Sequence, residues 1–213
     1  NSIQVFTTVG THTDGYTKPT NVTAVLVYVT GGGGGGGCGT SAFNQGGSGH
    51  AGGTAIKWIT PSTSDGSNLF STMSNVTVTV GNYGSAGISG NGGNATASSF
   101  GNFCSATGGN GGRHATNTAE PTLPGAGSGG DINITGGFGG GHHANNTVDA
   151  GGAGVGGSSF WGGGGLTADE YTDYYATAGQ AWGSGGGGGT HTSTYTAGKE
   201  GKQGIVVVWE YVG

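Results

Sequence analysis

The sequence predicts a mainly irregular and β fold, in which a bundle of packed polyglycine-II helices is flanked by a small β-sheet made by the N-terminal and C-terminal strands. Two observations predict it. Glycine supplies 56 of the 213 residues and recurs in clusters, against a usual share of about 7 per cent. Apolar, β-branched segments stand near both ends of the chain. We expect one glycine-rich domain over 1–213, with mostly β-strands in 1–80, the glycine bundle with its loops in 81–203 and a closing strand in 204–213.

Five segments are expected to be strands, because apolar residues alternate or run continuously in them. They are residues 2–9, 22–30, 54–59, 75–81 and 204–212. In VTAVLVYVT (22–30), Val25, Val27 and Val29 share one face, and in NVTVTVG (75–81) the three valines point inward. The nearly continuous apolar run GIVVVWEYV (204–212) predicts a strand covered on both faces.

Two local signals predict a turn and a short helix between these strands. Asp14-Gly15 in HTDGYTK (12–18) is a hairpin signal, so we expect a hairpin tip there. One helical turn is expected at 67–73, in the connection between the third and fourth strands.

The run Gly31–Gly37 raises the choice between a linker and ordered structure. Glycine loses more conformational freedom on folding than any other residue, so a flexible linker is one alternative. The other is an extended left-handed helix with three residues per turn and a rise of about 3.1 Å per residue. Copies of such a helix can pack backbone against backbone. Seven glycine clusters, with strands tying both ends together, favour the packed helices. Collagen is excluded by the missing Gly-X-Y period and by only 4 prolines.

Charge and motifs argue against an enzyme and against a nucleic-acid partner. The net charge is −5 and the five basic residues are scattered, so no phosphate-binding surface is expected. The chain has no GxSxG elbow and no Walker lysine. Adjacent His142 and His143 point to different sides of an extended chain, so a metal site is not expected there. We therefore expect no catalytic residue, no metal and no cofactor.

The two cysteines are expected to be buried thiols. Cys38 and Cys104 both flank glycine-rich segments. A disulfide between them is the alternative, although two cysteines make no disulfide framework.

Five pieces of the sequence resemble, in the same order, the glycine-rich domains that end phage and prophage tail fibres. They are VFTTVGTHT with PTNVTAVLVYVTGGGGGGG at the start, ASSFGNFCSATGG (97–109), GSGGDINITGG (127–137), GGSSFWGGGG (156–165) and the closing GIVVVWEYV. Together they cover almost the whole chain, and the ordered set is more specific than any one piece.

The resemblance implies a receptor-binding tip, similar to the distal adhesins of long tail fibres in T-even-like phages. In those adhesins, sandwiches of glycine helices carry variable loops that touch the bacterial surface. The implied partners are an outer-membrane protein or polysaccharide of the host and the tail-fibre shaft, and the implied location is the distal tip of the fibre on the virion. No N-terminal segment for attachment to a shaft is recognised. Either that segment precedes Asn1 or the domain ends a single fibre polypeptide, and a homotrimer stays open.

The inserts between glycine clusters are the candidate receptor-binding loops, because function is commonly carried by loops on a rigid scaffold. The richest is LTADEYTDYYATAGQAW (166–182). Its aromatic side chains are candidate anchors, and a lid over the glycine layers is the alternative. The candidates in this insert are Tyr171, Tyr174, Tyr175 and Trp182, with Asp169 and Asp173 for polar contacts. Asp169, Glu170 and Asp173 have no matching carboxylate elsewhere, so a glycosidase is not expected.

Three other inserts are candidates, each with an ordinary solvated loop as the alternative. The first is 113–123 with Arg113 and His114, the second is 142–148, and the third is 190–197 with His191 and Tyr195.

Two other classes of protein are rivals of the adhesin. An ice-binding protein is one, because TVTV and THTSTYT place threonine at alternate positions. An extracellular structural glycine-rich protein is the other. Ice-binding faces need uniform short side chains, whereas these inserts are irregular, aromatic and histidine-bearing, so the adhesin is favoured.

Overall fold

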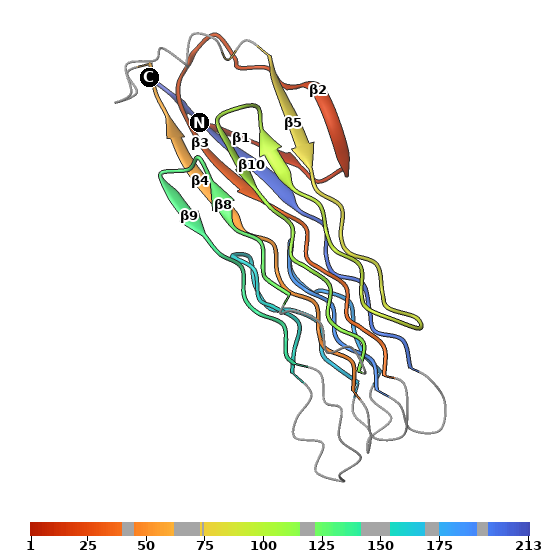
Figure 1. Ribbon diagram of the computed structural model, residues 1–213. Coiled ribbons are helices and arrows are strands. Elements are labelled where there is room, and N and C mark those ends of the chain that lie inside the picture. The colour runs from red at the N-terminus through yellow and green to blue at the C-terminus, as the bar shows by residue number, and fades with distance from the viewer. Residues whose placement is uncertain are drawn as a thin grey trace.

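The computed structural model describes residues 1–39, 45–61, 73, 75–115, 122–141, 154–168, 175–190 and 196–213. Within these residues the protein is all-β, with two antiparallel five-stranded sheets and no α-helix. Figure 1 shows the strands gathered at one end of an elongated molecule, with the glycine-rich segments running side by side away from them. The described residues contain no helix that could cross a membrane. The helical turn predicted at 67–73 lies outside them except for Met73, which is buried.

The first sheet joins the two ends of the chain. Its strand order is β1-β10-β3-β4-β9, all antiparallel. The strands are β1 (Ser2–Phe6), β10 (Ile205–Val212), β3 (Val22–Thr30), β4 (Thr54–Ile59) and β9 (Ile132–Ile134). The predicted sheet of N-terminal and C-terminal strands is therefore confirmed, and β3 and β4 have the predicted bounds.

The second sheet was not predicted as a unit. Its order is β2-β5-β6-β7-β8. The strands are β2 (Gly10–Tyr16), β5 (Val76–Val80), β6 (Ser98–Phe100), β7 (Cys104–Ala106) and β8 (Gly127–Ser128). Only β5 had a clear alternating pattern, because β6, β7 and β8 are too short to show a period.

The predicted hairpin tip at Asp14-Gly15 is wrong. Both residues lie inside β2, where the register against β5 shifts between His12 and Tyr16. Asp14 has φ of 53°, a left-handed conformation that aspartate tolerates better than most residues. The turn signal therefore marks a bulge in a strand and not the end of one.

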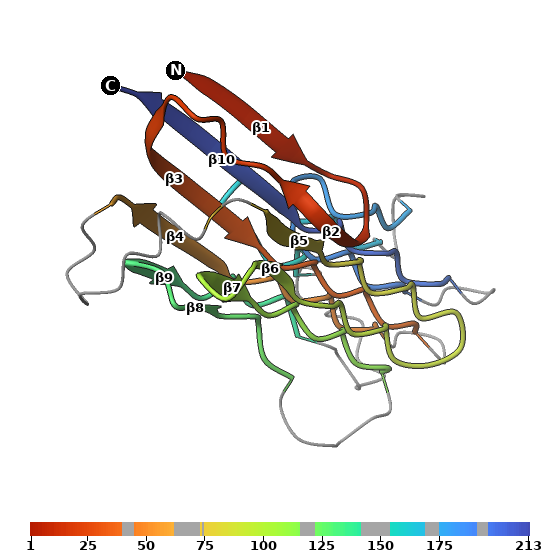
Figure 2. The same ribbon diagram turned by 90° about the horizontal axis from the view of Figure 1, so that it is seen from above.

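The hydrophobic core lies between the two sheets, whose strands Figure 2 shows from above. The alternation of β3 and β5 is confirmed, because Val25, Val27 and Val29 are fully buried and share one core with the three buried valines of β5. The aromatic rings of Tyr16 and Phe100 fill the same core, 5.4 Å apart between centroids. Cys104 joins this core and Cys38 is buried in the glycine region, both as free thiols, as predicted.

Backbone hydrogen bonds from successive residues of the segment 31–38 run to three neighbouring segments in turn. Its amide groups donate to 47–53, 90–96 and 199–202, over N···O distances of 2.8–3.1 Å. The donors to each neighbour are Gly31, Gly34 and Gly37 for the first, Gly32, Gly35 and Cys38 for the second, and Gly33 and Gly36 for the third. The direction therefore repeats every third residue, unlike a strand, in which it repeats every second.

The carbonyl groups of the same segment accept bonds from three further neighbours. These are the segments 84–87, 109–115 and 186–189. Residues 31–38 are thus surrounded by six extended segments, and Gly31–Gly37 are all buried. A linker is therefore wrong for this run.

Close approach of backbones explains why the run is glycine. A Cβ added to Gly34 would lie 2.1 Å from the carbonyl oxygen of Asn110. At every position of Gly31–Gly37 the nearest atom to such a Cβ would be a backbone oxygen at 1.9–2.2 Å. No side chain fits between segments that approach this closely.

Candidate functional site

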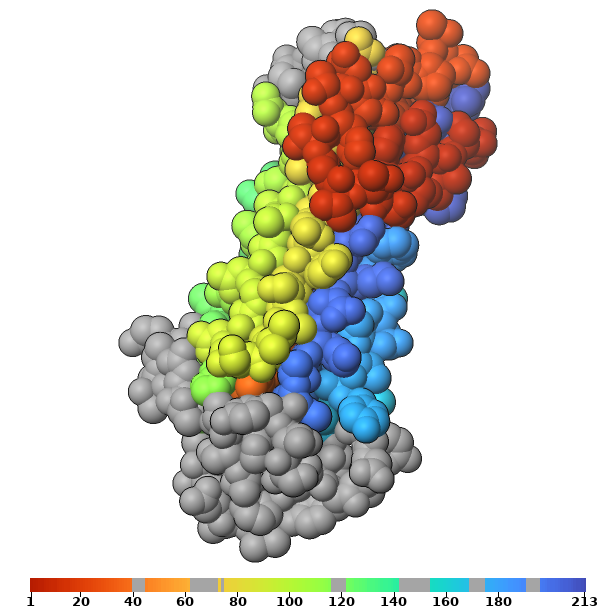
Figure 3. Space-filling view, turned by 90° about the vertical axis from the view of Figure 1, so that its right-hand side faces the viewer, coloured from red at the N-terminus to blue at the C-terminus, as the bar shows by residue number. Residues whose placement is uncertain are grey.

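Several glycine segments end side by side at the end of the molecule opposite the sheets (Figure 1). Backbone bonds hold the segment ends together there, from Ala115 to Cys38, from Gly46 to Gly189 and from Thr196 to Thr190. The side-chain amide of Gln45 donates to the carbonyl of Ala168 at 3.1 Å. We call this the distal end; Figure 3 shows the column of glycine-rich segments that leads to it from the strand-rich part.

One turn of the distal end lies wholly within the described residues. It runs from Ile88 to Asn91, and the carbonyl of Gly90 accepts a bond from the amide of Cys38. Ile88 is 75 % exposed. The amide of His114 donates to the Asn91 side chain at 2.7 Å, so His114 is tied to this turn.

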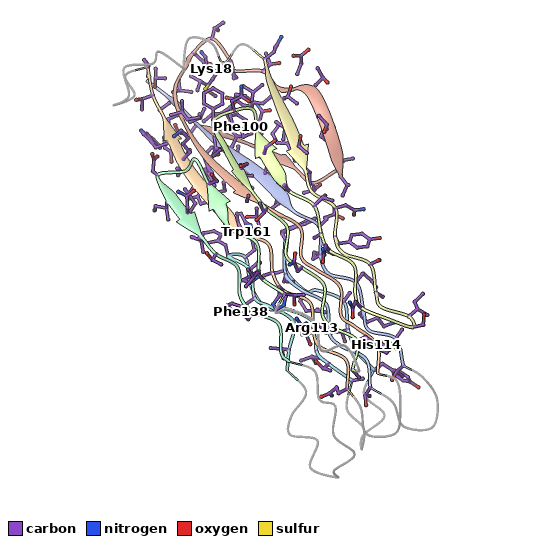
Figure 4. The ribbon with its side chains drawn as sticks, in the orientation of Figure 1. Lys18, Phe100, Arg113, His114, Phe138 and Trp161 are labelled. Atoms are coloured by element: carbon purple, nitrogen blue, oxygen red, sulfur yellow. The ribbon has the colours of Figure 1, made fainter. Side chains whose placement is uncertain are left out.

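A pocket of about 290 Å³ opens on the side of the column near this end. Its described walls come from three segments, with Gly47, Ser48 and His50 from the first, Gly112 and Arg113 from the second, and Phe138 to Gly141 from the third. Thr122 adds a hydroxyl to the lining. Figure 4 labels Arg113 and Phe138, which come from separate segments of the column.

His50 holds two walls of the pocket in place. Its Nδ1 accepts a bond of 2.9 Å from the amide of Gly139, so the proton sits on Nε2, which donates to the Thr122 hydroxyl at 2.6 Å. The ring is nearly buried and meets Phe138 edge-on, with centroids 5.7 Å apart. Burial, and then the charge of Arg113, lowers the pKa of His50. His50 is therefore a neutral positioning group.

Arg113 supplies the positive charge of the pocket. Its Nη2 atom is buried and has no acceptor among the described residues. No carboxylate occurs among the described residues that line the pocket. Phe138 is 66 % exposed. The pocket thus combines a cation, an open aromatic ring and walls of bare glycine backbone.

A family model described as a glycine-rich domain matches residues 7–211. The chain belongs to this family. The match leaves out β1 and the last residue of β10, and it covers every other strand and all the described glycine segments of the glycine-rich domain. Its description names the composition alone. No curated protein matches the chain.

The glycine-rich domain does not bring Trp182 together with Tyr175. Tyr175 is 74 % exposed. Trp182 lies where the column meets the sheets, because the amide of the next residue, Gly183, bonds Gln203 and a Cβ on Gly183 would touch Thr30 at the end of β3. The Trp182 ring lies 5.5 Å from the Lys202 ammonium.

Six candidate residues from the sequence lie outside the described residues. They are Asp169, Tyr171, Asp173, Tyr174, His191 and Tyr195. The insert 142–148 also lies outside them. Of the pair Arg113 and His114, the first lines the pocket and the second bonds the turn at Asn91, because adjacent residues of an extended segment face different neighbours.

Two pocket residues, His50 and Phe138, were not singled out from the sequence. Each is a lone bulky side chain inside a glycine cluster, in GSGHAGG and GGFGGG. Such an interruption is the signal that could have found them, because a bundle of bare backbones can place a large side chain only on its surface or in a gap.

Proposed function

We propose that the glycine-rich segments are polyglycine-II helices packed as a bundle. The period of three in the backbone hydrogen bonds of residues 31–38 supports this, because three residues per turn is the period of that helix. The same period recurs in the segment 46–53, where Gly46, Gly49 and Gly52 all donate to the segment 183–189.

On this scaffold, the glycine-rich domain is the tip of a phage tail fibre and a non-enzymatic adhesin. It recognises a receptor on the bacterial surface through the loops between its glycine helices. One observation carries this proposal: the described residues that border five inserts lie at the distal end, on a scaffold tied by hydrogen bonds, except Thr122, which lies beside His50 part-way along the column. The bordered inserts are 40–44, 116–121, 142–153, 169–174 and 191–195. The ordered resemblance to tail-fibre tips points the same way.

The tail-fibre shaft binds the opposite end of the domain, which carries the two sheets. On the outer face of the first sheet, Ile3 pairs with Trp209, Trp209 with Leu26, and Leu26 with Trp58. Ile3, Trp58 and Trp209 are 42–48 % exposed. An aromatic and apolar row of this kind is typical of a surface that meets another protein.

Binding of the labelled, purified domain to bacterial cells tests the proposal. We expect saturable binding to the cells of some strains, with loss after removal of either surface polysaccharide or outer-membrane proteins. Replacing 169–174 by a Gly/Ser segment of equal length should reduce the binding. The matched control replaces 62–72, which connects β4 to β5, and should leave it intact.

Two results would contradict the adhesin. Full binding by a variant in which all five inserts are replaced would separate binding from the distal end. Thermal hysteresis in solution, with no binding to any strain, would favour the ice-binding alternative.

A further inference from the structure

We propose that the pocket beside Arg113 binds a single sugar acid, with the guanidinium on the carboxylate and the Phe138 ring against one face of the sugar. The inference deepens the proposed function by naming a ligand class. It rests on that function for the source of the ligand, an acidic polysaccharide of the bacterial surface.

The charge of the pocket selects an anion. Arg113 has a buried nitrogen without an acceptor among the described residues, and a buried donor without a partner is destabilising. Arg113 also lines the pocket, and a carboxylate can accept two parallel bonds from a guanidinium. With His50 neutral and both its nitrogens already bonded, Arg113 is the cation that a ligand meets among the described lining residues.

The open ring favours a sugar. Phe138 is fixed on one side by its edge contact with His50 and by the bond from Gly139 to the same histidine. The rest of its ring is exposed. The C–H face of a pyranose is flat and apolar enough to pack on such a ring, while the hydroxyl of Thr122 lies in the same lining.

The size of the pocket favours one sugar ring over a peptide. Its volume of about 290 Å³ is at the lower limit of small-molecule sites. A peptide ligand usually needs an extended groove or a free sheet edge. At the rim, a Cβ on Gly141 would meet nothing within 4 Å, so the space beside this lining residue is open to the sugar ring.

NMR titration of the purified domain with D-glucuronate, D-galacturonate and N-acetylneuraminate tests the proposal. At least one should shift the signals of the Arg113 Nε–H and the Phe138 ring, and D-glucose should not. Arg113→Gln should weaken the binding about tenfold or more, and Phe138→Ala about threefold or more. Lys199→Gln is the matched control, because it removes the same charge from an exposed side chain of another segment.

Three results of the titration would overturn the sugar-acid proposal. Binding of none of the three sugar acids at millimolar concentration overturns the proposal, and so does equal binding of D-glucose. Tighter binding of an acetylated Asp-Glu dipeptide overturns the sugar in favour of an acidic protein. If Arg113→Gln fails to fold, the exposed Phe138→Ala variant decides alone.

Cell binding measured beside the titration separates this proposal from the adhesin. Full cell binding by both pocket variants, with sugar-acid binding lost, leaves the adhesin standing and overturns the pocket as its receptor site. Failure of the unmodified domain to bind any cell, with sugar-acid binding intact, counts against the adhesin and not against the pocket.

Discussion

The indole Nε1 of Trp161 donates a hydrogen bond of 2.9 Å to the buried hydroxyl of Thr30. Thr30 ends β3 and precedes the glycine run, and its hydroxyl also meets that of Thr54 at 2.8 Å. Phe160 and Trp161 both stack near Tyr28, with centroids 5.9 and 6.0 Å away. The turn GGSSFWGGGG (156–165) thus packs on the outer face of the first sheet, where the strands end and the glycine segments begin.

Removing the contacts of the Trp161 side chain should destabilise the whole domain. We expect Trp161→Ala to lower the free energy of unfolding by about 2–3 kcal/mol, because it removes a large part-buried ring and a hydrogen bond. Trp161→Phe should cost about 1 kcal/mol, since it keeps the stacking on Tyr28. Urea unfolding measures both. Trp58→Phe on the exposed outer face is the control, expected within about 0.5 kcal/mol.

Glycine in the buried run should be irreplaceable. Gly34→Val should lower the free energy of unfolding by about 3 kcal/mol or more, because its Cβ would overlap the Asn110 carbonyl. The neighbouring segments are hydrogen-bonded to one another, so one of them cannot move aside alone. Gly163→Ala is the control, since a Cβ there meets nothing within 4 Å. Thermal unfolding measures the two variants. Equal melting temperatures would mean that the run does not pack as described.

Burial of Cys104 should make the domain sensitive to alkali. Burial raises the pKa of this thiol to about 12, with opposing contributions from Lys57 and Asp131. The folded state therefore keeps a proton that the unfolded state releases above its own pKa near 9. The stabilisation is complete below pH 9 and is lost as pH rises towards 12, by at most about 1.4 kcal/mol per pH unit for one thiol.

Urea unfolding between pH 8 and pH 10 measures this loss. Cys104→Ala should flatten the decline over that range without abolishing it, since burial also raises the pKa of Cys38. An unchanged slope in Cys104→Ala would assign the decline to other groups. Native Cys104 should also resist thiol reagents until the domain unfolds.

The sequence predicted the strands that have a period and missed those that do not. β3 and β5 alternate over five or more residues, so their buried valines could be named. β6, β7 and β8 are two or three residues long and find their places through the register of neighbouring strands. The glycine clusters could be predicted to be ordered, but not which segment neighbours which, because bare backbones carry no side chains to tell one partner from another.

The candidate site shows the same limit. Tyr175 and Trp182 are close in sequence, but an extended chain separates residues seven positions apart by roughly 20 Å. Arg113 and His50 are far apart in sequence and meet in one pocket, because segments 45–53 and 109–115 are bonded side by side. That the inserts carry the binding stays a prediction from composition. The pairing of segments, which composition does not encode, decides what lies together.

Tyr175 should contribute to cell binding without contributing to stability. Its side chain is 74 % exposed, and it is the first described residue after the insert 169–174. Aromatic residues often dominate binding surfaces. We expect Tyr174→Ala combined with Tyr175→Ala to cut the affinity for bacterial cells at least about tenfold, which is about 1.4 kcal/mol. Tyr83→Ala, which removes another exposed tyrosine, is the control. Flow cytometry measures the binding and thermal unfolding the stability. A double variant that melts early would make the tyrosines a lid over the glycine segments, and one that folds and binds as before would move the site to Arg113 or to the insert 190–197.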